Sequence, residues 1–422
     1  MNYEVITPNP WMILPFALLL GAMALAPLLA ANWWRRHYPM VSFALGAIVL
    51  GYYLLDLEAS ARVWHMAHDY TSFIALVGSL FVVSGGIHIN VKGETTPLAN
   101  VVFLFIGTVV ANALGTTGAA MLLIRPWIRM NRRRVAAYHI AFFIFIVANV
   151  GGCLTPIGDP PLFLGYLRGV PFGWVTEHCW PMWATGVGIL LAMFYVVDRL
   201  NFTRAPRAAR EREIAPETWR FDGLPNLFFL AIVLGAVFVI RPIFVREALM
   251  LAAAIGSYFT TPKSVHTAND FNFHPVREVA VLFAGIFATM MPALDWLNLN
   301  ARWLLGDHPA PGIFFWGTGI LSSALDNAPT YLGFLDALFG ATGVRSTGEL
   351  VNQHALGLLA ISVGAVFFGA ATYIGNGPNF MVKAVADQQK IHMPTFPGFI
   401  LKFTLPFLLP MLLAVWLIFF RG

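Results

Sequence analysis

The stretch NVGGCLTPIGDPPLFLGYL (residues 149–167) follows the apolar run AAYHIAFFIFIVA, so it begins deep inside what reads as a membrane-spanning helix. It nevertheless gathers glycines and prolines around one carboxylate, Asp159. Proline lacks a backbone donor and clashes with the preceding turn, so helix interiors exclude it, and an unpaired carboxylate is costly in lipid. We therefore predict a helix that is interrupted inside the membrane and that carries an acid at the interruption.

The composition of the whole chain is that of a polytopic membrane protein. Of 422 residues, 58% are hydrophobic and 11% are charged, and the mean hydropathy is +0.70, whereas soluble domains carry about 25% charged residues. The net charge of +5 does not indicate nucleic acid, because the basic residues lie between apolar spans. Two cysteines are too few for a disulfide framework. The N-terminal segment does not resemble a removable signal peptide, so we expect the first apolar segment to be a retained span.

Apolar windows between polar breaks predict an all-α fold with two sets of five crossings. Two further apolar stretches, 99–124 and 311–341, are each interrupted in the middle by polar residues, and we expect both to be re-entrant hairpins. The first set of crossings lies near 11–30, 40–56, 71–91, 136–170 (interrupted) and 178–198, and the second near 224–243, 245–260, 277–297, 355–388 (interrupted) and 395–420.

The distribution of Lys and Arg orients the chain. If the charged segment 198–223 is cytoplasmic, alternation of the spans places 19 of the 26 Lys and Arg residues on the cytoplasmic side, as the positive-inside rule requires. The run NRRRV (131–135) is then a cytoplasmic anchor and not a nucleic-acid patch. The sequence thus predicts a multi-pass protein of a bacterial-type inner (plasma) membrane with both termini outside.

The two sets of spans are copies of one unit. LTPIGDPPLFL (154–164) aligns with ATYIGNGPNFM (371–381), and ANALGTTGAA (111–120) aligns with SSALDNAPTY (322–331). Each copy has an odd number of crossings, so the copies must be inverted in the membrane. Inverted repeats with interrupted helices meeting near the midplane are typical of secondary transporters. The predicted division is 1–198 (first repeat), 199–223 (cytoplasmic linker) and 224–422 (second repeat).

Small polar residues occupy both breaks and both hairpin tips, and we predict that they form one binding site. An unwound stretch exposes backbone groups that lipid cannot satisfy, so it survives only where it faces protein or a polar cavity. The helix ends beside it add partial charges. The candidate binding residues are Asn112, Thr116, Thr117, Thr155, Gly158, Asp159, Ser322, Ser323, Asp326, Asn327, Thr330, Thr372, Asn376 and Asn379.

The motifs LTPIGDPP and LSSALDNAPT resemble those of the ion-transporter superfamily, especially NhaD-type sodium/proton antiporters and their citrate-transporter relatives. The resemblance covers nearly the whole chain and implies a scaffold domain that dimerises and a transport domain that moves as an elevator. It also implies substrate elements at tips 112–117 and 322–330 and at breaks 153–161 and 372–379. Dicarboxylate members carry Ser-Asn-Thr at both tips, whereas this chain has Leu-Gly-Thr-Thr and Leu-Asp-Asn-Ala.

The charges of the predicted site favour a cation. Carboxylates with carbonyl and hydroxyl oxygens suit a hard cation, and neither break and neither tip contains a Lys or Arg for an anion. A proton and a sodium ion can compete for one carboxylate, so Asp159 and Asp326 are tentative sodium ligands, and no cofactor is expected beyond the transported Na⁺ and H⁺. Sodium- or proton-coupled transport of citrate or a dicarboxylate is the alternative. We expect a homodimer in the lipid bilayer and no nucleic-acid partner.

An enzyme is the remaining class to consider, since paired intramembrane aspartates can hydrolyse peptides. Such proteases need Gly-x-Gly-Asp, and this chain has Thr-Pro-Ile-Gly-Asp ending at Asp159, so we predict no enzymatic activity. The roles of three other residues stay open at this point. His88 and His139 lie within predicted spans as proton relays or packing residues, and Asp336 is a possible third titrating group.

Overall fold

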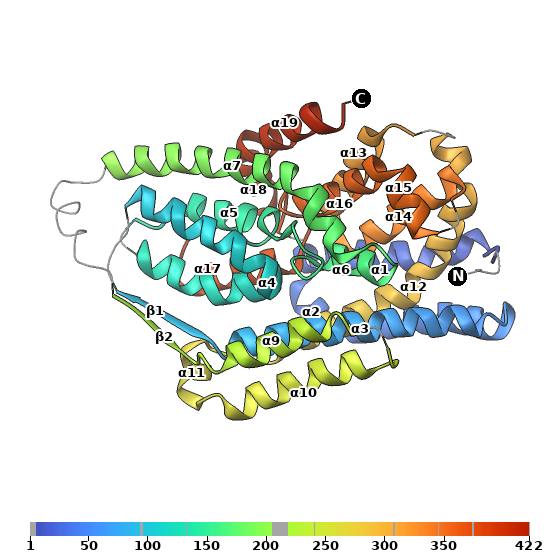
Figure 1. The fold of residues 1–422 in the computed structure, drawn as a ribbon, viewed down its shortest axis with the longest axis horizontal. Helices are drawn as coiled ribbons and strands as arrows, with labels where there is room; N and C mark the ends of the chain where they lie inside the picture. Colours follow the sequence, from blue (N-terminus) through green and yellow to red (C-terminus); the bar gives the residue numbers. More distant parts are fainter. Residues whose placement is uncertain are drawn as a thin grey trace.

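The computed structural model describes residues 6–92, 96–132, 134–204, 218–239, 241–306, 309–344, 346–373 and 375–421 (Figure 1). The described chain is built from helices and one pair of short strands. The α-helices of the first half are α1 (Leu14–Leu29), α2 (Ala31–Gly51), α3 (Ser60–Gly85), α4 (Pro97–Met130), α5 (Ala137–Ile146), α6 (Pro160–Leu167) and α7 (Phe172–Arg204).

The second half has a similar succession of helices. They are α9 (Asn226–Ala236), α10 (Val245–Thr260), α11 (Lys263–Ala268), α12 (His274–Leu305), α13 (Pro311–Ala324), α14 (Asn327–Thr342), α15 (Thr347–Gln353), α16 (Ala355–Gly369), α17 (Gly377–Gln388), α18 (Phe396–Phe399) and α19 (Leu409–Phe419). The strands are β1 (His88–Lys92) and β2 (Thr218–Asp222), and the 3-10 and π turns are η1 (Pro10–Ile13), η2 (Tyr52–Asp56), η3 (Val150–Gly152) and η4 (Ile400–Leu408).

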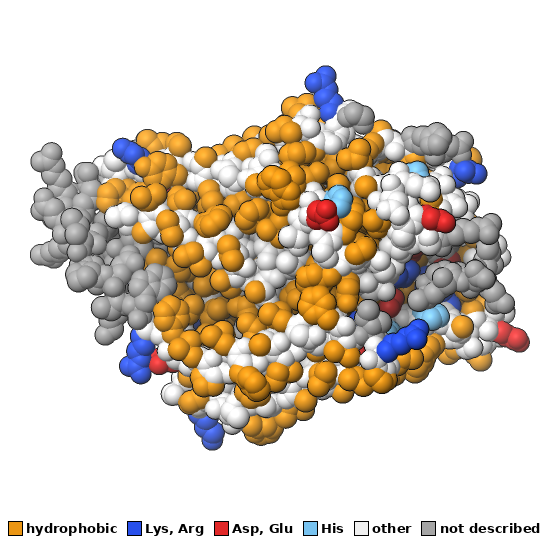
Figure 2. Space-filling model, viewed as in Figure 1, with side chains coloured by type: hydrophobic (Ala, Val, Ile, Leu, Met, Phe, Trp, Pro, Cys, Tyr) orange, Lys and Arg blue, Asp and Glu red, His pale blue; other side chains and the backbone are white. Residues whose placement is uncertain are grey.

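The predicted class, an all-α polytopic membrane protein, is confirmed. Within the described residues, seven helical segments are long and apolar enough to cross a membrane, and an eighth if the bent pair α15–α16 is counted as one span. Figure 2 shows hydrophobic side chains over much of one face, with most Lys and Arg near the margins of the view. Fewer segments qualify than the predicted crossings, because α9 and α10 have only 11 and 16 residues and the interrupted helices are divided into shorter pieces.

One group of helices, which we call the scaffold layer, contains α1, α2, α3, α9, α10 and α12. Within it α2 packs on α12, α10 packs on α3, and α3 and α12 contact each other. Figure 1 shows α3, α9 and α10 side by side along one edge of the molecule. The repeat alignment relates α2 to α10 and α3 to α12. The contact of α2 with α12 is therefore the counterpart of the contact of α10 with α3. The inverted orientation of the two copies remains a prediction.

A second group of helices, α4 to α7, α13, α14 and α16 to α19, forms what we call the site bundle. It contains a helical hairpin within α4, whose backbone leaves helical geometry at Gly115 (φ 72°, ψ 157°). Glycine is required there because other residues rarely adopt a positive φ. The two arms return to the same end, where the Asn100 side chain donates to that of Asn131 at 2.8 Å. The segments α13 and α14 form a second hairpin, in which Gly317 faces Phe334.

Both predicted interruptions are present in the site bundle. The first separates α5 from α6 and contains only the short turn η3, and the second separates α16 from α17. Close backbone approaches explain the glycines. A Cβ on Gly158 would lie 2.0 Å from the carbonyl oxygen of Gly152, and one on Gly375 would lie 2.7 Å from that of Gly369. These two pairs of glycines occupy aligned positions in the repeat.

The structure corrects the prediction for residues 86–91, which are not helical. Helix α3 ends at the pair Gly85-Gly86, and β1 pairs antiparallel with β2, placing His88 opposite Asp222. The β-branched residues of HINVK favour a strand once the glycines have ended the helix. His88 therefore lies outside the helical span, and its Nδ1 is 2.7 Å from Oδ1 of Asn269. Within the predicted linker, residues 205–217 lie outside the described residues.

Candidate functional site

Four separate elements converge on Asp159, whose side chain is fully buried. Its Oδ1 accepts hydrogen bonds from Thr116 Oγ1 at 2.5 Å and from Asn376 Nδ2 at 3.1 Å. Its Oδ2 accepts from Asn327 Nδ2 at 2.5 Å. The donors come from the first hairpin tip, the second break and the first residue of α14. We call Thr116, Asp159, Asn327 and Asn376 the central quartet. Hydrogen bonding of this kind satisfies a buried carboxylate.

The central quartet consists of two aligned pairs of the internal repeat, because Thr116 aligns with Asn327 and Asp159 with Asn376. The surrounding bonds repeat as well. Thr155 Oγ1 donates to the carbonyl of Asn112 at 2.7 Å, and Thr372 Oγ1 donates to that of Ser323 at 2.6 Å. The backbone N–H of Gly158 then donates to Thr155 Oγ1, and that of Gly375 to Thr372 Oγ1, at 3.0 and 3.1 Å.

Asn112 supports the backbone of the first break and has no hydrogen bond to Asp159 among the described contacts. Its Nδ2 donates to the carbonyl of Gly151 at 2.6 Å, and its Oδ1 accepts from the N–H of Leu154 at 2.9 Å. The Thr116 N–H donates to the carbonyl of Gly158 at 2.7 Å and so joins the hairpin tip to the break. Asn112 and Thr116 therefore fix the shape of this break, and among the described residues of the first tip only Thr116 bonds to the acid.

The predicted residues of the second hairpin tip and the second break likewise donate mostly to backbone carbonyls. Ser322 Oγ donates to the carbonyl of Ala365, and Ser323 Oγ donates to that of Ile320, each at 2.7 Å. Asn379 Nδ2 donates to the carbonyls of Gly369 and Thr372 at 2.7 and 2.8 Å. The carbonyls of Gly369 and Thr372 lie where α16 ends, and helix ends leave such carbonyls without a helical partner.

Asp326 has a different environment from Asp159, although both were predicted as sodium ligands. Its Oδ1 accepts from the N–H of Ala328 at 3.0 Å and caps the start of α14. Its own carbonyl accepts from Thr330 Oγ1 at 2.9 Å. Among the described residues no hydrogen bond joins Asp326 to Asp159. The observed role of Asp326 is that of an N-cap, for which Asp is one of the preferred residues.

Sequence reasoning missed Asn149, a fully buried side chain at the end of the first half-helix. Its Nδ2 donates to the carbonyl of Ile144 at 2.8 Å and to Oδ1 of Asn379 at 2.7 Å. Its Oδ1 accepts from Nδ2 of Asn376 at 3.0 Å. The repeat alignment could not reveal it, because the aligned position in the second copy is Val366. The one available signal in the sequence was an asparagine inside an apolar run, two residues before the pair Gly151-Gly152.

A small cavity, of which about 20 Å³ can be occupied by the centre of a water-sized molecule, reaches Asp159 from the boundary between the scaffold layer and the first hairpin tip. Thr117, which forms no part of the central quartet, contributes to its wall. The cavity is lined by Phe73, Leu76, Val77 and Leu80 of α3, by Leu114, Gly115, Thr116 and Thr117 of the tip, and by Ile157, Asp159, Pro160 and Phe163 around the first break.

One polar atom of the central quartet is left unsatisfied. Oδ1 of Asn327 is buried and has no hydrogen-bond partner within the described part of the chain, although buried polar groups are usually paired. The described residues contain no group of three or more His, Cys, Asp or Glu that could hold a metal ion. The site therefore offers one carboxylate and neutral oxygens, a donor set that fits an alkali cation or a proton better than a transition metal.

A second buried cluster of charges joins the two groups of helices. Arg62 of α3 pairs with Asp295 of α12 at 2.8 Å within the scaffold layer. Arg168, at the end of α6, lies 3.5 Å from Asp69 of α3 and 3.8 Å from Asp336 of α14. Asp336, whose role was open, thus faces an arginine and does not belong to the central quartet.

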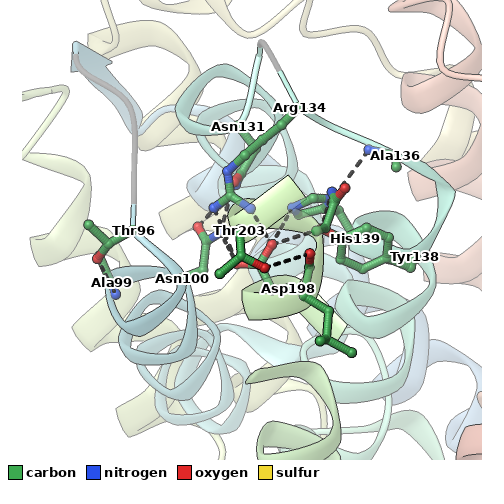
Figure 3. A network of polar contacts seen from close by, with 12 residues as sticks. Thr96, Ala99, Asn100, Asn131, Arg134, Ala136, Tyr138, His139, Asp198 and Thr203 are labelled. Carbon is green, nitrogen blue, oxygen red and sulfur yellow. Dashed lines mark hydrogen bonds and ion pairs between the residues drawn. The ribbon is translucent and has the colours of Figure 1, made fainter. Parts of the chain in front are cut away.

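His139, also left open, belongs to a polar network at the open end of the first hairpin (Figure 3). The centre of this network is the fully buried Asp198 of α7, which accepts from Asn100, Arg134 and Tyr138. His139 Nδ1 accepts from the backbone of Ala136, and its Nε2 lies 3.3 Å from Asp198 Oδ1. The network ties both arms of α4 to α5 and α7.

Comparisons with known proteins agree with the transporter-like geometry. Residues 6–420 match the family model described as "Putative citrate transport". Proteins named "Uncharacterized transporter" from Mycobacterium bovis and Mycobacterium tuberculosis are each 24% identical over 311 residues, covering 70% of this chain and 71% of theirs. A 46 kDa membrane protein of Mycobacterium leprae is 24% identical over 318 residues, with the same shares covered.

Proposed function

This chain belongs to the citrate transport family and is a membrane transporter rather than an enzyme, and from that premise we propose that it exchanges sodium or lithium ions for protons at Asp159. The observation that carries the proposal is the surroundings of that carboxylate. It is fully buried, is reached by a cavity, and is held by three neutral side chains from three other elements.

The chemistry of the central quartet supports a small cation. A carboxylate with hydroxyl and amide oxygens is the ligand type that hard cations prefer. The hydroxyl of Thr116 and the amide of Asn327 can each present an oxygen to an ion as well as a hydrogen to the carboxylate. A proton and a sodium ion cannot both neutralise one carboxylate, so binding of either displaces the other, and one site suffices for exchange.

The same surroundings are a poor match for a multiply charged anion. Recognition of carboxylates in proteins commonly uses Arg or Lys, and no ion pair between Asp159 and a basic side chain exists within the described chain. The hydroxyls of Ser322, Thr372 and Thr155 donate to backbone carbonyls. An anion would have to displace these bonds before it could use those hydroxyls.

The boundary between the two groups of helices supports an alternating-access mechanism of the elevator type. The cavity lies against α3 of the scaffold layer, and the residues of the central quartet all belong to the site bundle. Sliding of the site bundle past the scaffold layer would carry Asp159 from one membrane surface to the other with its hydrogen bonds intact. We extend the proposal to a homodimer in a bacterial inner membrane, with two inverted repeats and both termini outside.

Cation-coupled transport of citrate or a dicarboxylate is the second candidate, favoured by the description of the matching family. In that mechanism the cation at Asp159 would drive uptake, and the cavity wall near Thr117 would contact the anion. The two candidates differ in what must accompany sodium. The antiporter moves protons without any organic anion, whereas the symporter requires one.

The deciding experiment is transport by purified protein in proteoliposomes that contain a pH-sensitive dye. Sodium, lithium, potassium and citrate are added in turn to the outside. We expect sodium and lithium to release protons from the vesicles in the absence of citrate, and potassium to release none. Saturable, sodium-dependent uptake of labelled citrate without that proton release would replace the first candidate by the second.

A further inference from the structure

We propose that Asn149 is a positioning residue that keeps Asn376 as a permanent donor to Oδ1 of Asp159, so that the exchanged ion binds at Oδ2 together with Asn327. The inference rests on the proposed function, because it concerns the ion that Asp159 binds. It assigns different tasks to the two asparagines of the central quartet, Asn327 and Asn376. The repeat alignment relates Asn327 to Thr116 and Asn376 to Asp159.

The orientation of the Asn376 amide is fixed by what surrounds it. Its Nδ2 faces three oxygens, namely Asp159 Oδ1 at 3.1 Å, Asn149 Oδ1 at 3.0 Å and the carbonyl of Ala148 at 3.3 Å. Rotation of the amide by a half turn would bring its oxygen against three other oxygens with no hydrogen between them. Asn376 therefore remains a donor whether or not an ion is bound.

Asn149 is itself held in one orientation. Its Nδ2 donates to the carbonyl of Ile144 and to Oδ1 of Asn379. The Asn379 amide is oriented in turn by the two carbonyls that accept from its nitrogen. Backbone carbonyls of both breaks thus determine, through Asn379 and Asn149, that an oxygen is presented to Asn376. Asn149 thus connects the backbone of the breaks, through Asn376, to the carboxylate of Asp159.

Asn327 lacks such constraints on its oxygen. Its Nδ2 donates to Asp159 Oδ2 at 2.5 Å, while its Oδ1 is buried without a hydrogen-bond partner among the described residues. A half turn of this amide would place Oδ1 beside Asp159 Oδ2. Two neighbouring oxygens can bind a sodium ion, and the same amide oxygen can accept from the carboxyl when Oδ2 carries a proton. One amide rotation therefore serves both ions.

The test compares Asn149→Ala, Asn376→Ala and the double variant in proteoliposomes, using the sodium KM and the maximal rate of proton release. We expect each single variant to raise the sodium KM about tenfold, the effect of one lost hydrogen bond at a binding site, with the maximal rate little changed. The double variant is expected to have the KM of the more affected single variant, because Asn149 acts through Asn376.

Asn100→Ala is the matched control, because Asn100 is also fully buried and its amide donates to Asn131 and Asp198, away from the central quartet. We expect it to lower thermal stability without changing the sodium KM. If Asn149→Ala does not fold, Asn149→Ser, which keeps an acceptor oxygen, replaces it, and a smaller rise in KM is expected. An unchanged KM in the folded variant, or KM effects that add in the double variant, would overturn the positioning role.

Thermal stabilisation of the detergent-solubilised protein by sodium separates this inference from the proposed function. Wild-type protein that is stabilised by sodium but releases no protons would contradict the exchange and leave the binding site open to test. In that case the midpoint sodium concentration replaces KM, with the same tenfold shift expected for Asn149→Ala. An unshifted midpoint in that variant would overturn the positioning role alone.

Discussion

Asn327 and Asp159 are 168 residues apart in the sequence and are joined by a hydrogen bond of 2.5 Å. The bond connects the tip of the second hairpin to the first break. A residue of the second half thus contributes to the surroundings of an acid in the first half. An ion that binds at this carboxylate acts on both halves at once. In the proposed mechanism, an ion at this one buried acid would therefore affect helices from both halves of the chain.

Replacing Asp159 by Asn should abolish sodium-dependent proton release while leaving the protein folded. Asn has nearly the same shape and still accepts hydrogen bonds through one oxygen, but it can bind neither a proton nor a cation with charge neutralisation. Dye-loaded proteoliposomes measure the exchange. Asp387→Asn is the control, since Asp387 is exposed and pairs only with Lys383 one turn away among the described contacts. Exchange that survives in the Asp159 variant would place the cation elsewhere.

Replacing Asp326 by Asn should weaken exchange without abolishing it. Asn is also a favourable N-cap, so α14 keeps its first turn, and the acid has no hydrogen bond to Asp159 in the described chain. We expect the sodium KM to rise by about tenfold or less, the effect of losing one nearby charge. Complete loss of proton release, with normal sodium-induced thermal stabilisation, would show that Asp326 carries an exchanged proton itself.

Gly158 should not tolerate a methyl group. A Cβ there would lie 2.0 Å from the Gly152 carbonyl oxygen, and overpacking of this kind costs about 1–3 kcal/mol or more. Gly158→Ala is therefore expected to lower the melting temperature and the yield of monodisperse protein. Gly377→Ala is the comparison, because a Cβ there meets no atom within 4 Å. Equal melting temperatures for the two variants would contradict the close approach at the first break.

Arg62 and Asp295 should behave as a buried ion pair. Removal of one partner leaves the other charge without compensation, which costs about 3–5 kcal/mol, so Arg62→Leu is expected to destabilise the protein strongly. Arg62→Leu with Asp295→Leu should recover a large part of that loss, although Tyr53 then loses the carboxylate to which it donates at 2.7 Å. Chemical denaturation of the wild type and the two variants in detergent measures the difference. A double variant less stable than the single one would argue against this account.

The inverted arrangement can be tested by labelling. Arg132 follows the first hairpin and Ser346 follows the second, and both are exposed. A cysteine at position 132 should react with an impermeant reagent only from the cytoplasm, and one at position 346 only from outside. Cys153 and Cys179 are buried and are replaced by serine in the background chain. Reaction of both new cysteines from the same side would exclude inversion.

The breaks and the meeting of the hairpin tips could be predicted because proline, glycine and repeated polar residues are local signals. The sequence places Thr116, Asn327 and Asn376 in one candidate site with Asp159, whereas their hydrogen bonds to this acid are visible only in the structure. Asn149 could not be found by aligning the two copies, since the second copy has Val366 in its place. Tertiary hydrogen bonding, which leaves no periodic mark on a sequence, decides its role.

Other differences have equally specific causes. The strand pair β1–β2 was missed because HINVK continues an apolar run, and only the preceding glycines end the helix. Asp326 is predicted as a sodium ligand together with Asp159, and in the structure its carboxylate accepts from the N–H of Ala328 at the start of α14. An Asp at such a position can cap the helix or bind an ion, and the sequence alone does not reveal which of these roles it has.

The network around Asp198 determines which end of the first hairpin separates more easily. Separating the arms of the first hairpin at that end would break three hydrogen bonds between Asn100 and the side chains of Asn131 and Asp198, and the bond to the carboxylate alone contributes about 1.5–3 kcal/mol. At the tip two bonds join the hairpin to the first break: the bond from Thr116 to the Asp159 carboxylate contributes about 1.5–3 kcal/mol, and the bond to the Gly158 carbonyl about 0.5–1.5 kcal/mol. Thermal fluctuation should therefore loosen the tip, where two bonds hold the hairpin to the break, more often than the open end, where three bonds join Asn100 to the network, so that the proposed ion would exchange at the tip while the two arms stay together.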